Sequence, residues 1–139
     1  MEHKIEEELQ GFSEIACQHA LYPYSYGEPC RFNTYEQIQG PCGDTVRIWL
    51  YCEDELVHEA AFATDGCASS IACGSVTVSL AQGVKLQDAL KIGQREVLAA
   101  LGQFPVEFAH CALLASNTLK GAIKKYLNQR ERNEDGRQE

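Results

Sequence analysis

The chain has 139 residues, seven of them cysteine, and a formal net charge of −8. A chain of this length is most often one domain, and we expect a single domain over residues 1–139 whose core removes roughly 70% of the unfolded surface from water. The acidic balance argues against nucleic acid and against an anionic membrane as partners. It suits partners that present basic surfaces.

The sequence shows no signal for export and none for a membrane. No apolar run approaches the roughly 20 residues that a membrane span needs. Residues 1–8 are mostly charged and lack the apolar centre of a signal peptide. We therefore expect a cytoplasmic protein, in which cysteines more often bind metal or take part in catalysis than form disulfides.

The spacing of apolar residues predicts the elements of the first half. Apolar side chains three and four positions apart predict an N-terminal helix over residues 3–20. Residues 21–41 are rich in Tyr, Pro and Gly and predict irregular structure. Residues 45–52 alternate between apolar and polar, and a second strand is expected over residues 56–64, so the two form an antiparallel hairpin.

The second half is predicted to be helical. Apolar patterns favour helices over residues 67–82, 86–102 and 110–130, and a glycine follows or ends each of the first two. The charged residues 131–139 predict a frayed tail.

The most informative stretch is the point at which the second strand gives way to a helix. Cys67 lies at this junction, directly after Gly66, which lets the backbone turn sharply. The first amides of a helix have no partner inside it and carry partial positive charge. A thiol at such a position tends to ionise to the thiolate, the form that binds metal or attacks sulfur.

Two more cysteines have comparable surroundings. Cys111 opens the last helix and follows His110, and Cys42 lies in a tight turn two residues before Asp44. None of the spacings is that of a Cys-x-x-Cys pair, so a zinc-ribbon pattern has no support and the ligands must converge through the fold. Sheet ends and helix N-termini gather on one face of α+β domains, and thiolates in such a group suit a soft metal or an iron–sulfur cluster.

The other four cysteines carry weaker signals. Cys52 is in phase with the apolar face of its strand, and Cys17 lies on the N-terminal helix, so both are expected to pack in the core. Cys73 is either a core residue or a further member of the site. Cys30 lies in the irregular segment, where it is either a spare thiol near the site or unrelated to it.

Three segments resemble the signature segments of IscU/NifU-type iron–sulfur cluster assembly scaffolds, which have a NifU N-terminal domain. They are Gly40-Pro41-Cys42-Gly43-Asp44, Thr64-Asp65-Gly66-Cys67-Ala68-Ser69-Ser70-Ile71-Ala72 and His110-Cys111-Ala112-Leu113-Leu114-Ala115. They occur in the family's order and near its spacing, and the similarity runs from about residue 40 to residue 127. The resemblance implies an α+β fold with a small antiparallel three-stranded sheet packed against several helices, and ligands in loops and at helix N-termini.

The resemblance also implies a function, that of a scaffold and carrier and not of an enzyme. A transient 2Fe–2S cluster would be assembled from iron and from sulfur that a cysteine desulfurase supplies, and then passed to apo iron–sulfur acceptor proteins. The family's ligand positions fall on Cys42, Cys67 and Cys111, and Asp44 and His110 match additional ligand or exchange positions. A ferredoxin and a frataxin-like protein are further implied partners, and zinc is able to occupy the same ligands in the isolated protein.

Other functions would use the same residues. A zinc-bound sulfur relay of the SufU type would carry persulfide on Cys111, but that type usually lacks a histidine before its last cysteine. A thiol hydrolase built on Cys111, His110 and Asp44 is disfavoured because adjacent helical residues point about 100° apart. Phe108 stands where the family has the lysine of a chaperone-binding Leu-Pro-Pro-Val-Lys segment, which argues against chaperone-driven release.

Overall fold

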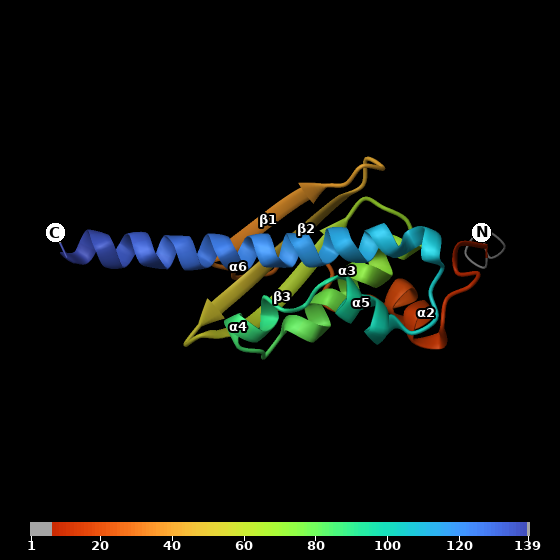
Figure 1. Ribbon diagram of the computed structural model, residues 1–139, viewed down its shortest axis with the longest axis horizontal. Coiled ribbons are helices and arrows are strands. Elements are labelled where there is room, and N and C mark those ends of the chain that lie inside the picture. Colours follow the sequence, from red (N-terminus) through yellow and green to blue (C-terminus); the bar gives the residue numbers. More distant parts are fainter. Residues whose placement is uncertain (1–6, 139) are drawn as a thin grey trace.

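A three-stranded antiparallel sheet lies against a layer of helices in the computed structural model, which describes the backbone of residues 7–138 and the side chains of residues 7–132 (Figure 1). The sheet order is β1-β2-β3, and α3 and α6 cover one face. The α+β fold with a small antiparallel sheet is therefore confirmed. The elements are α2 (Glu14–Leu21), β1 (Thr34–Gln39), β2 (Thr45–Glu53), β3 (Leu56–Thr64), α3 (Ala68–Ala81), α4 (Leu86–Ala89), α5 (Gln94–Leu101), η1 (Val106–Phe108) and α6 (Ala109–Gln138).

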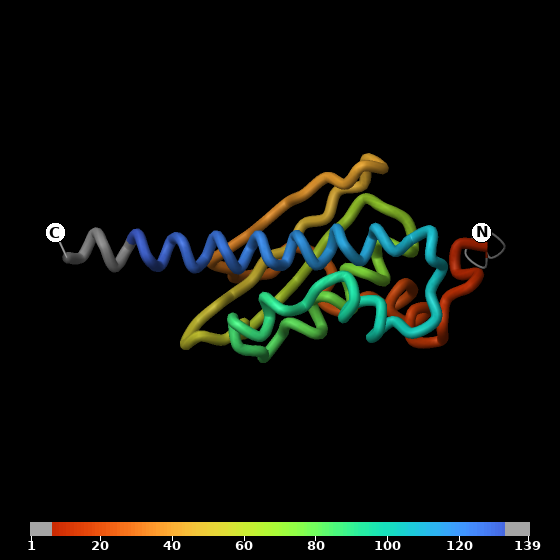
Figure 2. The backbone as a smooth tube through the Cα atoms, in the orientation of Figure 1, coloured from red at the N-terminus to blue at the C-terminus, as the bar shows by residue number. Residues whose placement is uncertain are grey.

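The core lies between the sheet and the two covering helices. Val46, Ile48 and Leu50 alternate along β2 with residues of the other face, and all three are buried. Phe62 of β3 lies so close to α3 that a Cβ on Gly74 would stand 2.4 Å from its ring. α6 crosses the sheet and extends beyond it, and its N-terminal end lies on the side of the molecule where α2 and the residues just before it lie (Figure 2). Within residues 7–138, no helix combines the length and apolar character that crossing a bilayer requires.

Two expected helices are interrupted at glycines. The helix expected over residues 3–20 is interrupted: Glu7 and Glu8 are helical, and α2 begins at Glu14. The break falls at Gly11, which has a φ of 86°, and the Ser13 hydroxyl caps α2 by accepting the Ala16 N–H. Residues 3–6 lie outside the described part. The helix expected over residues 86–102 divides into α4 and α5 at Gly93, whose N–H donates to Glu96 Oε1 at 2.9 Å.

The sequence also misses a strand and ends a helix too early. Part of the segment predicted to be irregular forms β1, which packs under α6: the Thr34 hydroxyl donates to the Ala122 carbonyl, and Lys125 pairs with Glu36 at 3.0 Å. β1 has few apolar residues, so its strand character comes from these contacts and from pairing with β2. α6 is helical as far as Gln138, whereas a frayed tail was expected over residues 131–139.

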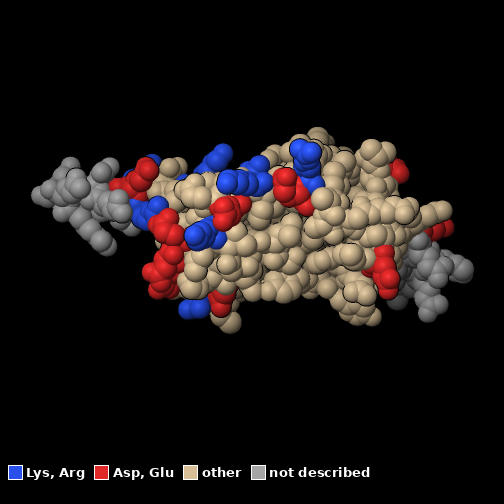
Figure 3. All heavy atoms as spheres, turned by 60° about the horizontal axis from the view of Figure 1, so that its bottom comes forward, with Lys and Arg blue, Asp and Glu red and all other residues tan. Residues whose placement is uncertain are grey.

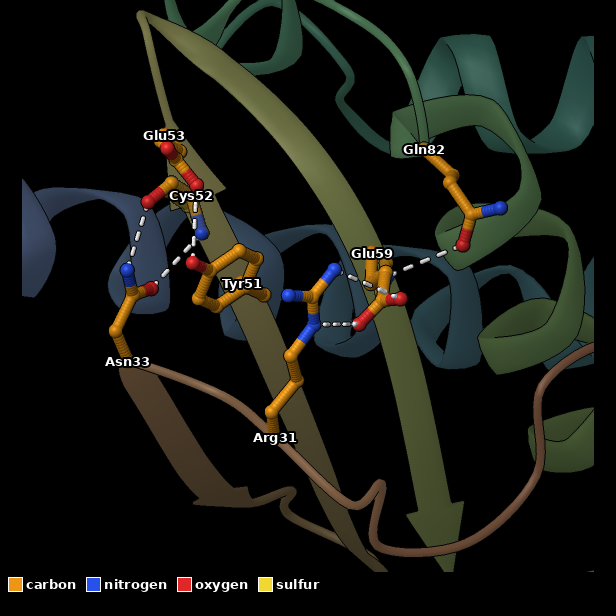
Figure 4. A network of polar contacts seen from close by, with 8 residues as sticks. Arg31, Asn33, Tyr51, Cys52, Glu53, Glu59 and Gln82 are labelled. Atoms are coloured by element: carbon orange, nitrogen blue, oxygen red, sulfur yellow. Dashed lines mark hydrogen bonds and ion pairs between the residues drawn. The ribbon is translucent and has the colours of Figure 1, made fainter.

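Polar side chains fasten the segment before β1 to the outer side of the sheet (Figure 4). Arg31 pairs with Glu59 at 3.0 Å and stacks on the ring of Tyr51 at 4.1 Å. Asn33 exchanges two hydrogen bonds with the backbone of Cys52, beside the point where the β2–β3 register shifts. Cys52 itself is buried, as predicted, and burial raises the pKa of its thiol to about 11.

Candidate metal centre

The five predicted site residues come from three segments that meet where α6 begins. Figures 1 and 2 show the β1–β2 turn and the starts of α3 and α6 at the same end of the molecule. Cys42 and Asp44 lie in the turn, Cys67 precedes α3, and His110 and Cys111 belong to the first turn of α6. Cys42 and Cys67 are exposed, whereas Cys111 is only 4% exposed.

His110 joins two of the thiols through one ring nitrogen. Its Nδ1 lies 3.1 Å from the Glu107 carbonyl oxygen, which only accepts, so Nδ1 carries the proton. Nε2 is then the nitrogen with a free lone pair. It lies 3.4 Å from Cys42 Sγ and 3.7 Å from Cys111 Sγ. A histidine whose other nitrogen donates to a backbone carbonyl is oriented as metal-bound histidines usually are.

Cys67 is the residue that precedes the first turn of α3, in extended conformation (φ −84°, ψ −168°). The glycine before it is required by close approach and not by the sharp turn that the sequence suggests, since Gly66 is absent from the residues with positive φ. A Cβ on Gly66 would stand 2.4 Å from Ser70 Oγ and 2.9 Å from Asp44 Oδ2. The absence of a side chain at Gly66 therefore lets Asp44 lie against the start of α3.

Two serines of the segment around Cys67, to which the sequence assigned no role of their own, connect the site. Ser70 Oγ donates to Asp44 Oδ2 at 3.2 Å and reaches Cys111 Sγ at 3.7 Å. Ser69 Oγ lies 3.1 Å from Cys67 Sγ, and the Cys111 thiol donates to it at 3.7 Å. Their position in the first helical turn after Cys67 was visible in the sequence, but not which side chains they meet.

Burial and neighbouring charge shift the pKa values of two buried thiols, Cys111 and Cys73. Burial raises the pKa of the Cys111 thiol, the hydrogen bonds between it and Ser69 and Ser70 lower it, and the nearby Cys67 and Asp44 raise it further. Burial also raises the pKa of Cys73, to which the charges of Cys111 and Cys67 add. Cys73 is 0% exposed and lies in the core cluster, so it is a core residue close to the site.

The contacts among these residues are pairwise. Among the side chains of residues 7–132, no group of three His, Cys, Asp or Glu is arranged to hold a metal ion as it stands. Cys30 lies elsewhere, in a hollow lined also by Arg31 and Glu59, and Cys17 is half-buried on α2. The chemistry of the donors nevertheless fits an iron–sulfur cluster, because three thiols, a carboxylate and an imidazole nitrogen are available at one end of the molecule.

Comparison with known proteins gives the family. Residues 14–133 match the model of the NifU-like N terminal domain. The chain belongs to this family. Over 86 residues it is 37% identical to the iron-sulfur cluster assembly scaffold protein IscU 1 of Archaeoglobus fulgidus, and this match covers 62% of our chain and 56% of that protein. Over 118 residues it is 32% identical to the nitrogen fixation protein NifU of Azotobacter chroococcum mcd 1, and this match covers 83% of our chain and 38% of NifU.

Two solved structures share the fold. A SufU protein from Fervidobacterium islandicum AW-1, described as a cluster assembly scaffold for the SUF system, matches with a TM-score of 0.67 and 20% identity, over 83% of this chain and 98% of that one. The N-terminal part of a NifU-like protein from Brucella abortus matches with a TM-score of 0.62 and 17% identity, over 86% and 95%. Our chain spans about half the length of the first curated relative above, and less of NifU.

Proposed function

We propose that this NifU-like chain is a scaffold on which a transient 2Fe–2S cluster is assembled and from which it is passed to other proteins. The observation that carries the proposal is the meeting of Cys42, Cys67 and Cys111 with Asp44 and His110, through contacts of 3.1–3.7 Å that run directly or through Ser69 and Ser70. Relatives at 37% and 36% identity, from Archaeoglobus fulgidus and Rickettsia prowazekii, are named as iron-sulfur cluster assembly scaffold proteins, which supports it.

Each proposed ligand has a part that follows from its chemistry and exposure. Thiolates of Cys42, Cys67 and Cys111 suit iron, and the first two are exposed where a sulfur donor can reach them. A hollow of about 260 Å³ opens beside Cys67. Asp44 and His110 offer an oxygen and a nitrogen in place of a fourth thiolate, which gives the weaker hold that a cluster destined for transfer needs.

The partners we propose are those that cluster assembly requires. A cysteine desulfurase supplies sulfur, a ferredoxin supplies the electrons that reduce it to sulfide, a frataxin-like protein assists, and apo iron–sulfur proteins accept the cluster. On the face drawn in Figure 3, lysine and arginine lie in the middle and toward the C-terminal end, and the described residues at the opposite end, where α6 begins in Figure 1, are only acidic and uncharged. This distribution supports partners whose docking surfaces are basic.

Chaperone-driven release is not part of the proposal. Phe108, which stands where the family's chaperone segment has lysine, lies in η1 with its ring centroid 6.4 Å from that of Phe104, and both rings pack against the core. Phe108 is apolar and packs against the core, so this position offers no basic side chain to a chaperone.

A zinc-bound sulfur relay is the second candidate. The observation in its favour is the donor set, because Cys42, Cys67 and Asp44 are ligands that zinc accepts and would leave Cys111 to carry persulfide. In that case zinc would stay bound, and persulfide would form on a single cysteine.

Anaerobic reconstitution separates the two candidates. The protein is incubated with ferrous iron, cysteine and a cysteine desulfurase, and its visible absorption and metal content are recorded. Cys42→Ser, Cys67→Ser and Cys111→Ser are compared with Cys30→Ser, which removes an exposed cysteine outside the site and serves as the matched control.

For a scaffold we expect a brown chromophore in the parent and in Cys30→Ser, its loss or strong weakening in the other three variants, and its transfer to an apo-ferredoxin. Retained zinc, no chromophore and persulfide on one cysteine would instead establish the relay.

A further inference from the structure

Two buried hydroxyl groups lie between the proposed ligands. Ser69 and Ser70 are each 2% exposed in the first turn of α3. Ser69 contacts Cys67 and Cys111, and Ser70 contacts Asp44 and Cys111. Each hydroxyl therefore touches two proposed ligands, and Cys111 is common to both.

These contacts differ from those that hydroxyl side chains usually make in a helix. Further along α3, Thr77 donates to the Cys73 carbonyl and Ser79 to the Val76 carbonyl, which is the common local pattern. Within residues 7–132, the side-chain hydrogen bonds of Ser69 and Ser70 go to the proposed ligands instead. Two buried hydroxyls thus stabilise groups outside their own helix.

Ser70 has one proton and two acceptors. A serine hydroxyl donates a single hydrogen bond, so Ser70 cannot serve the Asp44 carboxylate and the Cys111 sulfur fully at the same time. The carboxylate is nearer, at 3.2 Å against 3.7 Å for the sulfur. The Asp44 carboxylate is therefore the better placed of the two acceptors.

The lack of space around Ser70 keeps it in this position. A Cβ on Gly66 would stand 2.4 Å from Ser70 Oγ and 2.6 Å from its Cβ, so the preceding loop lies directly against this side chain. The hydroxyl is consequently held between Asp44 and Cys111 and not free to turn to solvent.

We infer that Ser69 and Ser70 are positioning residues of the metal centre, which orient Cys67, Cys111 and Asp44, and that Ser70 transfers its hydrogen bond from Asp44 to Cys111 when the carboxylate binds metal. The inference rests on the proposed function, because it takes these three residues as ligands. Partners that hydrogen-bond to metal ligands commonly change metal affinity by about 10- to 100-fold, and hydrogen bonds to sulfur tune iron–sulfur centres.

The test uses cobalt(II) as an optical probe of the thiolates. The full-length apoprotein is titrated anaerobically, and the sulfur-to-cobalt charge-transfer band is followed in Ser69→Ala and Ser70→Ala. Ser79→Ala is the matched control, because it removes a serine hydroxyl from the same helix away from the site. Circular dichroism and thermal unfolding of each apoprotein verify that folded chains are compared.

We expect both site variants to bind cobalt about tenfold more weakly than the parent, and Ser79→Ala to match the parent. The band should move to longer wavelength in the site variants, because a thiolate without its hydrogen bond holds its electrons less tightly. In an Asp44→Ala background, Ser70→Ala should shift the band about as far as it does in the parent, since in both cases the hydroxyl donates to Cys111 once cobalt is bound.

Each contrary result has a distinct meaning. A parent that binds cobalt and site variants with the parent's affinity and band would overturn the inference and leave the scaffold function standing. A clearly larger shift without Asp44 would show that Ser70 still donates to the carboxylate when cobalt is bound, and would overturn the transfer of the Ser70 hydrogen bond. A parent without a thiolate–cobalt band would overturn the ligand set, and with it both proposals.

Discussion

At the scale of single residues, the candidate centre depends on which atoms face one another. His110 directs Nε2 toward Cys42 and Cys111 because its Nδ1 is engaged by a carbonyl. Asp44 approaches α3 because Gly66 has no side chain. The exposed thiols and the buried one therefore occupy different environments within one site, which suits delivery from outside and anchoring within.

Asp44 is expected to limit how long a cluster stays bound. Removing the carboxylate in Asp44→Ala should lengthen the lifetime of a reconstituted cluster several-fold, because the ligand that exchanges most readily is lost. The decay of visible absorbance in the presence of a chelator measures this lifetime. Asp88→Ala, which removes an exposed carboxylate within α4, is the control. An Asp44→Ala cluster as short-lived as the parent's would contradict the role given to Asp44.

At the scale of elements, α3 is the helix that connects the sheet, the N-terminal helix and the site. It packs against β3 through Gly74 and against α2 through a contact between His19 and Ser75. The Ser75 hydroxyl, which is 0% exposed, also accepts the Tyr24 N–H at 2.7 Å. α3 therefore fixes both the segment that follows α2 and the turn that carries Cys67.

The contact between α3 and β3 predicts the effect of Gly74→Ala. Alanine is a better helix former by about 1 kcal/mol, but its Cβ would stand 2.4 Å from the Phe62 ring, which is fully buried and has no room to move. We expect a net loss of about 1–3 kcal/mol in the free energy of unfolding, measured in urea.

Gly121→Ala in α6 is the comparison, because its Cβ meets the flexible carboxyl end of Glu36 and should cost less. Equal costs for the two variants would mean that the α3–β3 contact is not rigid.

The contact between α2 and α3 predicts a pH effect. Burial lowers the pKa of His19 from its ordinary value of 6.5, so the unfolded chain binds a proton more readily than the folded one. The stability that neutral His19 contributes is present above pH 6.5 and is lost as the pH falls below that value. His19→Asn should therefore lose less free energy of unfolding than the parent between pH 7.5 and pH 5.5, and identical losses would exclude His19 as a source of the pH dependence.

At the scale of the whole molecule, one core separates the cysteines into two groups. Cys30, Cys42 and Cys67 are exposed, whereas Cys52 and Cys73 are buried between the sheet and the helices. Burial also raises the pKa of both inner thiols, which keeps them protonated near neutral pH. The fold thus leaves reactive thiols at the surface and makes the inner ones inert.

Alkylation of the metal-free protein should reveal this division. With iodoacetamide at pH 8, we expect rapid modification of the exposed cysteines and at least tenfold slower modification of Cys52 and Cys73, followed by peptide mass spectrometry. In denaturant all seven should react at similar rates. Rapid labelling of Cys73 in the folded protein would show that the region behind the site opens readily.

Local sequence patterns were enough to predict several elements. The β2–β3 hairpin follows from alternation, α3 and α6 from helical spacing, and the family from the segments around Cys42, Cys67 and Cys111. The apolar periodicity continued through Gly11 and Gly93, so the sequence predicted two unbroken helices where the structure has a break and a new N-cap. The glycines and capping residues were visible in the sequence, but the apolar pattern was the stronger signal.

The identity of β1 as a strand, the environments of the cysteines and the contacts of the two serines depend on tertiary packing. β1 is a strand because it pairs with β2 and bonds to α6, although its polar sequence does not predict a strand. Cys73 is a core residue and Cys111 a partner of His110, although both are small thiols on helices, because burial and contact depend on neighbours distant in sequence. The contacts of Ser69 and Ser70 with Asp44 and Cys111 likewise join residues 26 or more positions apart in the sequence. Sequence patterns report which face of an element is apolar, and the packing of elements decides which side chains meet.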